Sequence, residues 1–243
     1  MGAKTISIII PTYQHAQTLP YCVDSILKQT VLPAEIIVVD DGSTDRTPEV
    51  LEKYGTRIKL IRQRNQGGPV ARNNGFAAST GDYVLFCDAD VQMHPPMLAG
   101  LSRALDEHPE ASYAYCRFKL GWKKFYSYPF SAKRLRRFNY IHTSSLIRRE
   151  HFPGFDSQLR RFQDWDLWLT MLEHGHSGIF VKEEFFHMGM ATERTGISTW
   201  VPSSIFKVPW RLIGWAPPVV RYYEQARQII FTKHHLKGKK WGI

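Results

Sequence analysis

Two carboxylates separated by a single residue, Asp88 and Asp90, follow directly after an apolar run at 83–87. Neighbouring carboxylates repel each other, and one of them holds a proton unless a cation lies nearby. Carboxylate oxygens are the ligands that Mg²⁺ and Mn²⁺ prefer. A divalent ion held there could neutralise a diphosphate and make it a better leaving group. The structural alternative is that the two acids only cap a helix introduced by Pro95 and Pro96.

Polar residues also follow three other apolar runs, each of which we interpret as a strand. They occupy residues 11–14, 40–43 and 65–68. In an open parallel sheet the carboxyl ends of the strands meet at one edge, and ligands bind there. We therefore expect these segments and the Asp88–Asp90 pair to line one site.

The helix expected after Gly67-Gly68-Pro69 is suited to binding an anion, because its first N–H groups have no partners within the helix. Arg72 in its first turn adds a planar guanidinium group. A surface ion pair is the alternative role for Arg72. Neither G-x-G-x-x-G nor G-x-x-x-x-G-K-[ST] occurs in the chain. The dinucleotide-binding and P-loop classes therefore lose their main support.

A second acid cluster, Gln163-Asp164-Trp165-Asp166, lies at the start of an amphipathic segment. A general base requires a carboxylate that reaches the open side of the cation site. An Asp at a helix start can equally serve as an N-cap. The residues alone leave both roles open for Asp164 and Asp166.

Hydrophobic periodicity predicts the elements that must position these residues. Continuous β-branched or apolar runs, typical of buried parallel strands, occur at 6–10, 36–39, 58–61 and 83–87. Helical patterns occur at 19–29, from 44 or 45 to 55, and at 69–79, 97–107, 164–174 and 219–235. This alternation predicts an α/β fold with a doubly wound, mainly parallel sheet flanked by helices. Residues 112–148 are mixed, aromatic and basic, and give no clear pattern.

The formal charge of +10 on the 243 residues is unevenly spread. Residues 117–149 hold ten Lys and Arg and no acid, and residues 207–240 hold eight against one acid. This excess is either a solvated basic face or an attraction to phosphate groups, a lipid surface or nucleic acid. We expect no nucleic-acid partner, because nucleic-acid binding leaves the acids at the strand ends unexplained.

Cysteine usage and hydropathy predict a cytoplasmic location. The three cysteines, Cys22, Cys87 and Cys116, are scattered and form no CxxC motif, which is typical of a reducing compartment. No apolar run reaches the roughly 18–20 residues of a membrane span. The N-terminal apolar run that ends at Pro11 is too short for a secretory signal.

Several segments, in a fixed order, carry a resemblance to a known family. They are SIIIPTYQ, SILKQT, EIIVVDDGSTD, NQGGPVARNNGFAASTGDYVLFCDAD, GFD and QDWDLWLTM. Together they resemble the family 2 glycosyltransferases with a GT-A fold, over roughly residues 5–190. The resemblance implies a Rossmann-like GT-A domain that transfers a sugar from a nucleotide-sugar with inversion.

The resemblance also implies a nucleotide site. Pro11, Thr12 and Tyr13 match the residues that pack around the base. Asp41, with Asp40 beside it, is similar to the acid that binds the uracil ring in uridine-using members.

Catalytic and metal positions follow from the same resemblance. Arg72 matches a position near the nucleotide phosphates. Asp88 resembles the acid near ribose and metal, and Asp90 the one that binds Mn²⁺ or Mg²⁺. Asp164 matches the catalytic base of the family's Glu-Asp pair, whose Glu is replaced by Gln163 here.

Further positions are implied around these. His187 is the candidate for a histidine that closes over the nucleotide and touches the metal, and a packed or surface role is its alternative. His142, Gln163 and Trp165 are assigned to the donor-sugar and acceptor side. The QxxRW motif of processive synthases is absent from the chain, so we expect a single transfer per encounter.

We divide the chain into a catalytic domain at 1–199 and a basic, aromatic C-terminal helical extension at 200–243. Within the domain, 1–95 forms the nucleotide-binding half and 96–199 the acceptor and base half. The extension is interpreted either as a surface anchor on an anionic membrane or as a helix packed back onto the domain. The first interpretation suits a lipid-linked acceptor and peripheral attachment to the inner face of the cell membrane.

Two other classes remain as alternatives. A catalytically impaired nucleotide-sugar-binding relative is one, because Gln163 already departs from the family pattern. A sugar nucleotidyltransferase is the other, but it should carry a Gly-rich loop with Arg after the first strand, where this chain has PTYQ.

Overall fold

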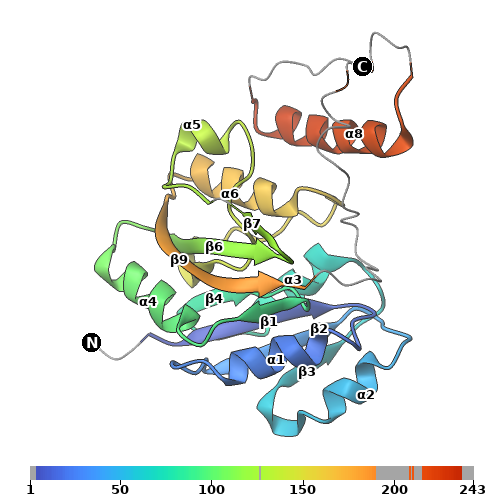
Figure 1. Cartoon of the computed structure of the whole chain (residues 1–243), viewed down its shortest axis with the longest axis vertical. Helices are drawn as coiled ribbons and strands as arrows, with labels where there is room; N and C mark the ends of the chain where they lie inside the picture. The colour runs from blue at the N-terminus through green and yellow to red at the C-terminus, as the bar shows by residue number, and fades with distance from the viewer. Residues whose placement is uncertain (1–3, 126, 190–207, 209, 211–214, 237–243) are drawn as a thin grey trace.

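The four apolar runs of the first ninety residues form neighbouring parallel strands. The computed structural model describes residues 4–125, 127–189, 208, 210 and 215–236. The strands lie in the order β3-β2-β1-β4, all parallel (Figure 1). Their bounds are β1 (Ile6–Thr12), β2 (Glu35–Asp40), β3 (Lys59–Arg62) and β4 (Tyr83–Phe86).

The sheet continues from β4 in the order β8-β6-β9-β5, with β7 paired to β6. The bounds are β5 (Val91–Met93), β6 (Tyr113–Leu120), β7 (Lys123–Phe125), β8 (Leu146–Arg148) and β9 (Gly178–Met188). Strand β8 is antiparallel to β4 and β6, β9 is parallel to β6, and β5 is antiparallel to β9. The described residues thus form one nine-stranded, mostly parallel sheet, which confirms the predicted fold class.

Helices cover both faces of this sheet. Their bounds are α1 (Leu19–Leu27), α2 (Thr47–Glu52), α3 (Gly68–Ala77), α4 (Met97–Glu107), α5 (Ala132–Leu135), α6 (Gln163–Glu173) and α8 (Pro218–Lys233), with short 3₁₀ turns at Gly55–Arg57 and Arg149–His151. One core cluster joins α1, α2 and α4 to side chains such as Ile8 and Ile10. On the opposite face, Ile9 and Phe86 pack with α6 and with Ile230 of α8. Alternate residues of β1 therefore serve different layers, as strand geometry requires.

The helices expected from periodicity are all present; α4 has the predicted bounds, and the ends of the others are shifted by a few residues. Helix α2 covers only Thr47–Glu52, because the chain then enters the 3₁₀ turn at Gly55–Arg57. The unpatterned region 112–148 contains β6, β7, α5 and β8. Strand β6 has a register shift on either side of Arg117, which breaks the simple alternation of a strand.

Helix α3 lies unusually close to the sheet. A side chain at Gly75 would collide with Ile9 of β1 and Val39 of β2. Only glycine allows this approach, and Ala71 on the same face is fully buried. The close contact fixes the distance from the sheet of Arg72, which lies three residues before Gly75 on α3.

Helix α8 packs beside α6, at the upper right of the molecule in Figure 1. Val220 and Ile230 are buried, and the ring of Phe231 lies 5.9 Å from that of Trp165. The extension expected at 200–243 falls partly outside the described residues, but its helix packs on the domain. In the part of the chain that the structure describes, no helix has both the length and the apolarity to cross a membrane.

Candidate active site

The carboxyl ends of β1 and β2 bring two of the predicted polar segments together. Thr12 at the end of β1 pairs in register with Asp40 at the end of β2. The N–H of Asp41 donates to the Thr12 carbonyl at 2.9 Å. Pro11 and Thr12 are buried, whereas Tyr13 is 39% exposed. Tyr13 is therefore the member of this group whose ring is open to a ligand.

The carboxylates of Asp40 and Asp41 shape the loops beside these strand ends. Asp40 accepts a hydrogen bond from the backbone N–H of Ser43 at 2.9 Å. Asp41 accepts from the backbone N–H groups of Gln66 and Gly67, each at 2.8 Å. The Asp41 carboxylate thus fixes the loop that leads into α3.

Arg72 connects the carboxylate pair to the start of α6. Its Nη2 donates to Asp88 Oδ1 at 2.7 Å, and its Nη1 donates to Gln163 Oε1 at 2.8 Å. Its guanidinium lies over the ring of Phe155, 5.3 Å from the centroid. The Nε of Arg72 is buried and has no hydrogen-bond partner among the described residues. Arg72 is therefore a partly buried ion-pair partner at the site and not a surface residue.

Asp88 lies at the centre of this arrangement. Burial raises the pKa of its carboxyl, but the charges of Arg72 and then His142 outweigh burial and hold the pKa below its usual value. His142 Nε2 lies 3.9 Å from Asp88 Oδ2, and its ring packs against the stacked rings of Phe118 and Phe186. Burial lowers the pKa of His142, because desolvation disfavours the imidazolium. The lowered pKa of Asp88 favours its ionised form, and the lowered pKa of His142 favours the neutral imidazole.

His15 belongs to the same site, although no motif in the sequence predicted it. Its Nδ1 lies 3.2 Å from the backbone N of Tyr13 and 3.3 Å from Thr12 Oγ1. Burial lowers its pKa, opposed by the negative charges of Asp88 and Asp45. The available signal was its position directly after PTYQ, within the polar residues that follow β1.

Asp164 is the second residue of α6, and its pKa is shifted in the opposite direction to that of Asp88. Desolvation, with the nearby charge of Asp88, raises the pKa of Asp164 to about 6, against the lowering effects of the Trp165 N–H and of Arg72. The Asn139 Nδ2 donates to Asp164 Oδ2 at 2.6 Å. A carboxylate with this pKa can accept a proton near neutral pH. Asn139 lies in the region that gave no sequence pattern.

Neither acid cluster caps a helix. Helix α6 begins at Gln163, and its preceding residue is Phe162, which makes no side-chain cap. Helix α4 is preceded by Pro96, again without a side-chain cap. The capping alternatives for Asp88, Asp90 and Asp164 are therefore wrong.

Two predicted residues make contacts with other parts of the domain. His187 on β9 pairs in register with Gln92 of β5, and its ring lies 5.7 Å from that of His94. Trp165 is 3% exposed, and its Nε1 donates to the Leu135 carbonyl at 2.7 Å. The structure therefore brings Arg72, Asp88, His142, Gln163 and Asp164 together, but it does not bring the Trp165 ring to them.

The donor chemistry of Asp88 and Asp90 suits a hard divalent cation. Asp90 directly precedes β5, so that both acids lie between the ends of β4 and β5. No group of three His, Cys, Asp or Glu side chains arranged to hold a metal occurs within the described residues. Mg²⁺ typically takes one or two carboxylates and completes its coordination with phosphate oxygens and water. Asp88 and Asp90 fit this requirement with a diphosphate as the remaining ligand.

The fold, with a carboxylate pair after β4, defines the GT-A class of glycosyltransferases. The chain is similar to Staphylococcus aureus TarS 1-349 in complex with UDP-GlcNAc, with a TM-score of 0.68 and 20% identity over 95% of this chain and 72% of that one. It is also similar to the mannosyltransferase PcManGT from Pyrobaculum calidifontis in complex with GDP-Man and Mn²⁺, with a TM-score of 0.63, 20% identity, and 98% and 71% covered.

The sequence identifies the family within this class. Residues 7–168 match the family model described as Glycosyl transferase family 2. The chain therefore belongs to glycosyl transferase family 2.

Two relatives illustrate the range of this family. The PGL/p-HBAD biosynthesis glycosyltransferase of Mycobacterium tuberculosis (strain ATCC 25177 / H37Ra) is 32% identical over 176 residues, which cover 68% of this chain and 69% of that protein. The glycosyltransferase YibD of Escherichia coli (strain K12) is 40% identical over 99 residues, or 40% of this chain and 29% of YibD. Against YibD and the next three relatives the match spans only about a third of their length.

Proposed function

We propose that this chain transfers a sugar from a nucleotide-sugar, UDP-linked, to an acceptor hydroxyl group with inversion. The acceptor oxygen forms a bond to the anomeric carbon while the bond from that carbon to the diphosphate oxygen breaks. The electron pair leaves with the diphosphate, and the hydroxyl proton passes to Asp164. The observation that carries this proposal is the position of Asp164 at the start of α6, joined to Asp88 through Arg72 and Gln163. Its raised pKa of about 6 supports the role of base.

The leaving group is assigned to the Arg72 side of the site. A guanidinium group stabilises the charge of a departing diphosphate, and the Nε of Arg72 is a buried donor with no partner among the described residues. A phosphate oxygen of the bound donor would accept a hydrogen bond from this Nε–H group. Tyr13, exposed after the end of β1, is the candidate to contact the base. Asp41, whose N–H donates to the neighbouring Thr12 carbonyl, is the second candidate.

We assign Mn²⁺ or Mg²⁺ to Asp88 and Asp90, with His187 as a further candidate ligand. When bound, such an ion supplies Lewis-acid stabilisation of diphosphate charge. The Mn²⁺ in the PcManGT complex supports this assignment by fold alone. His187 has less support than the two acids, because it lies against His94.

The acceptor proposed is a sugar or a lipid-linked glycan precursor of the cell envelope, which contacts the enzyme beside His142, Gln163 and Asp164. The name of the mycobacterial relative, a PGL/p-HBAD biosynthesis glycosyltransferase, supports this class. We place the protein in the cytoplasm, with peripheral contact to the inner face of the membrane.

The test is a donor panel with and without Mn²⁺, applied to the wild type and to Asp164→Asn. We expect metal-dependent release of UDP from one UDP-sugar, and a loss of at least about a hundredfold in turnover for the variant, because general base catalysis contributes 10²–10⁴. Calorimetric affinity for UDP should be unchanged. Unchanged turnover in Asp164→Asn would contradict the base assignment, and nucleotide binding without turnover in the wild type would favour the impaired relative.

A further inference from the structure

The entrance of α6, which carries Asp164, is in contact with α8. Phe162, the residue before α6, has φ +59°, a left-handed conformation that non-glycine residues rarely adopt. Its ring lies 5.1 Å from that of Tyr223 on α8 and 5.8 Å from that of Trp165. The unfavourable backbone conformation two residues before the candidate base is therefore held by packing against α8.

A buried carboxylate of α6 depends on α8 as well. Asp166 is 3% exposed, two residues after Asp164. Its Oδ1 lies 2.8 Å from Lys233 Nζ and 2.8 Å from His234 Nε2, both at the end of α8. A buried carboxylate needs paired charges and hydrogen bonds to compensate for its lost hydration. In the part of the chain that the structure describes, α8 supplies the cations that contact Asp166.

Lys233 and His234 also contact residues before α6 and at its end. Lys233 Nζ lies 2.7 Å from Asp156 Oδ2, in the loop that leads to α6. His234 Nδ1 lies 2.9 Å from Glu173 Oε1, in the last turn of α6. Lys233 and His234 thus contact the lead-in loop, the first turn and the last turn of α6.

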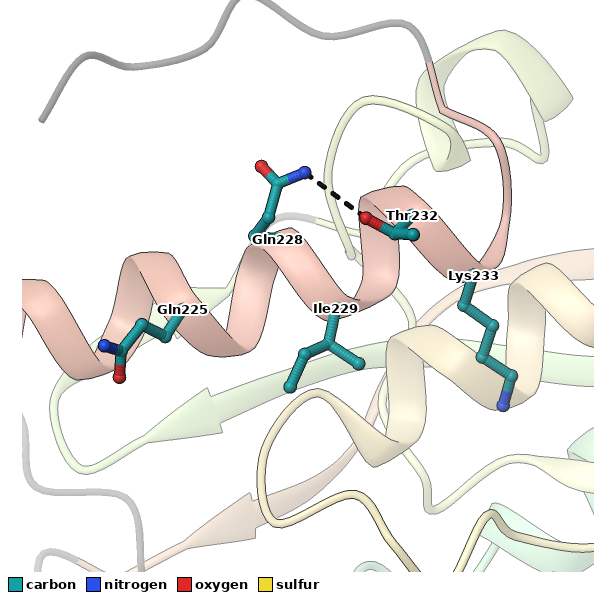
Figure 2. A pocket seen from close by; sticks show the side chains of 5 residues that line it. All are labelled: Gln225, Gln228, Ile229, Thr232 and Lys233. Carbon is teal, nitrogen blue, oxygen red and sulfur yellow. Dashed lines mark hydrogen bonds between the residues drawn. The ribbon is translucent and has the colours of Figure 1, made fainter.

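Gln228 and Thr232 of α8 point away from this contact. Figure 2 shows Gln228 and Thr232 on the side of α8 opposite to α6, joined by a hydrogen bond of 3.3 Å. Lys233 extends in the other direction, towards α6. These residues line an open hollow together with Gln225 and Ile229. Substitutions at Gln228 therefore provide a control on the same helix.

We propose that α8, which lies outside the family match at 7–168, is a positioning element for the catalytic base. Lys233 and His234 are positioning residues: they fix Asp166, and through the first turn of α6 they fix the carboxylate of Asp164. The inference rests on the proposed function, in which Asp164 accepts the proton. A displacement of about 1 Å in a catalytic group can reduce a rate by about a hundredfold.

The contact depends on pH through His234. The charged groups that face it are Asp166 and Glu173 of α6, with Lys233 beside it on α8. Burial lowers the pKa of His234, but hydrogen bonds to the two carboxylates outweigh burial and raise it. The imidazolium therefore persists to a higher pH than that of a free histidine. Both contacts are complete while His234 is protonated, and they weaken as the pH rises through its raised pKa.

The first test compares Lys233→Met and His234→Ala with the control Gln228→Ala. We expect kcat to fall about tenfold to a hundredfold in the first two, with the calorimetric Kd for UDP unchanged and Gln228→Ala equal to wild type. Lys233→Arg should restore most of the rate, since it retains the charge. Lys233→Gln, which keeps a donor, is the milder variant if Lys233→Met does not fold.

The second test is hydrogen exchange, which does not require turnover. We expect faster amide exchange across 163–173 in Lys233→Met and His234→Ala, with protection of β1 to β4 unchanged. Unchanged exchange in α6, or a parallel loss of UDP affinity and kcat, would overturn the positioning role. If the wild type transfers no sugar, the proposed function fails, and hydrogen exchange alone then decides whether α8 holds α6.

Discussion

Asp88 and Asp164 are carboxylates of one site, yet their pKa values move in opposite directions. Asp88 has a guanidinium 2.7 Å away, whereas Asp164 receives the neutral amide of Asn139. An opposite charge outweighs desolvation at Asp88, and desolvation dominates at Asp164. The pKa of Asp88 is therefore lower than its usual value, whereas that of Asp164 is raised to about 6. Such a separation is typical of acid–base sites.

A pH profile tests this separation at the residue scale. The base must be ionised, so kcat should rise with pH through about 6, the pKa of Asp164. Asn139→Leu removes a donor that favours the ionised form, so the acid limb should move to higher pH. The shift is measured from initial rates at saturating donor between about pH 4.5 and about pH 8. This range extends roughly two units to either side of that pKa. An acid limb at the wild-type position in Asn139→Leu would contradict the role of Asn139.

At the scale of the element, the position of Arg72 depends on how closely α3 approaches the sheet. Gly75 lies against Ile9 and Val39, so the helix axis is set by the absence of a side chain. A residue of any size there must push α3 outward. The guanidinium that contacts both Asp88 and Gln163 then moves with the helix.

Gly75→Ala should destabilise the protein by about 1–3 kcal/mol, the usual effect of overpacking a core. It should also weaken UDP binding, because Arg72 is displaced. Chemical denaturation and calorimetry measure the two effects. Ala77→Gln, on an exposed position of α3, is the matched control and should change neither. A Gly75→Ala variant as stable as wild type would show that α3 has room to move.

At the scale of the whole molecule, apolar residues of the C-terminal helix face the domain. Ile230 is fully buried, and Phe231 contacts Trp165 of α6. The exposed aromatic and apolar side chains of α8 are Tyr222, at 41%, and Ile229, at 54%, and Trp215, which precedes the helix, is 59% exposed. Exposed Arg221 lies beside Tyr222. Membrane contact, if made by this helix, must use these residues.

Sedimentation with lipid vesicles tests that contact. We expect binding to anionic vesicles at low salt and little binding to neutral ones, since each basic residue near anionic lipid contributes about 1 kcal/mol. Added salt should release the protein, because surface charges are screened. The paired substitution Arg221→Gln with Tyr222→Ala should weaken binding without changing the α6 contact. No binding to anionic vesicles at low salt would exclude a membrane-surface role for α8.

The first half of the fold could be predicted from the residues because its signals are local. Strands such as 6–10 are continuous apolar runs, and helices such as 69–79 carry their own start signals. Both lie within a few residues of their observed bounds. In contrast, β6 pairs with β8 and β9, which lie 26 or more residues away along the chain. Such long-range pairing produces no hydrophobic periodicity within 112–148 from which the strands could be predicted.

The sequence by itself determined the fold class, the family and the edge of the sheet where the polar residues gather. It did so because strand order fixes where strand ends lie. Only the tertiary structure decided that Arg72 bridges Asp88 and Gln163, that Asn139 contacts Asp164, and that Trp165 is a packing residue. These contacts join residues 16 to 91 positions apart. The pKa values of such groups depend on their burial and on their distances from charges and hydrogen-bond partners. Residues far apart in the sequence set both quantities, so they cannot be predicted from local sequence.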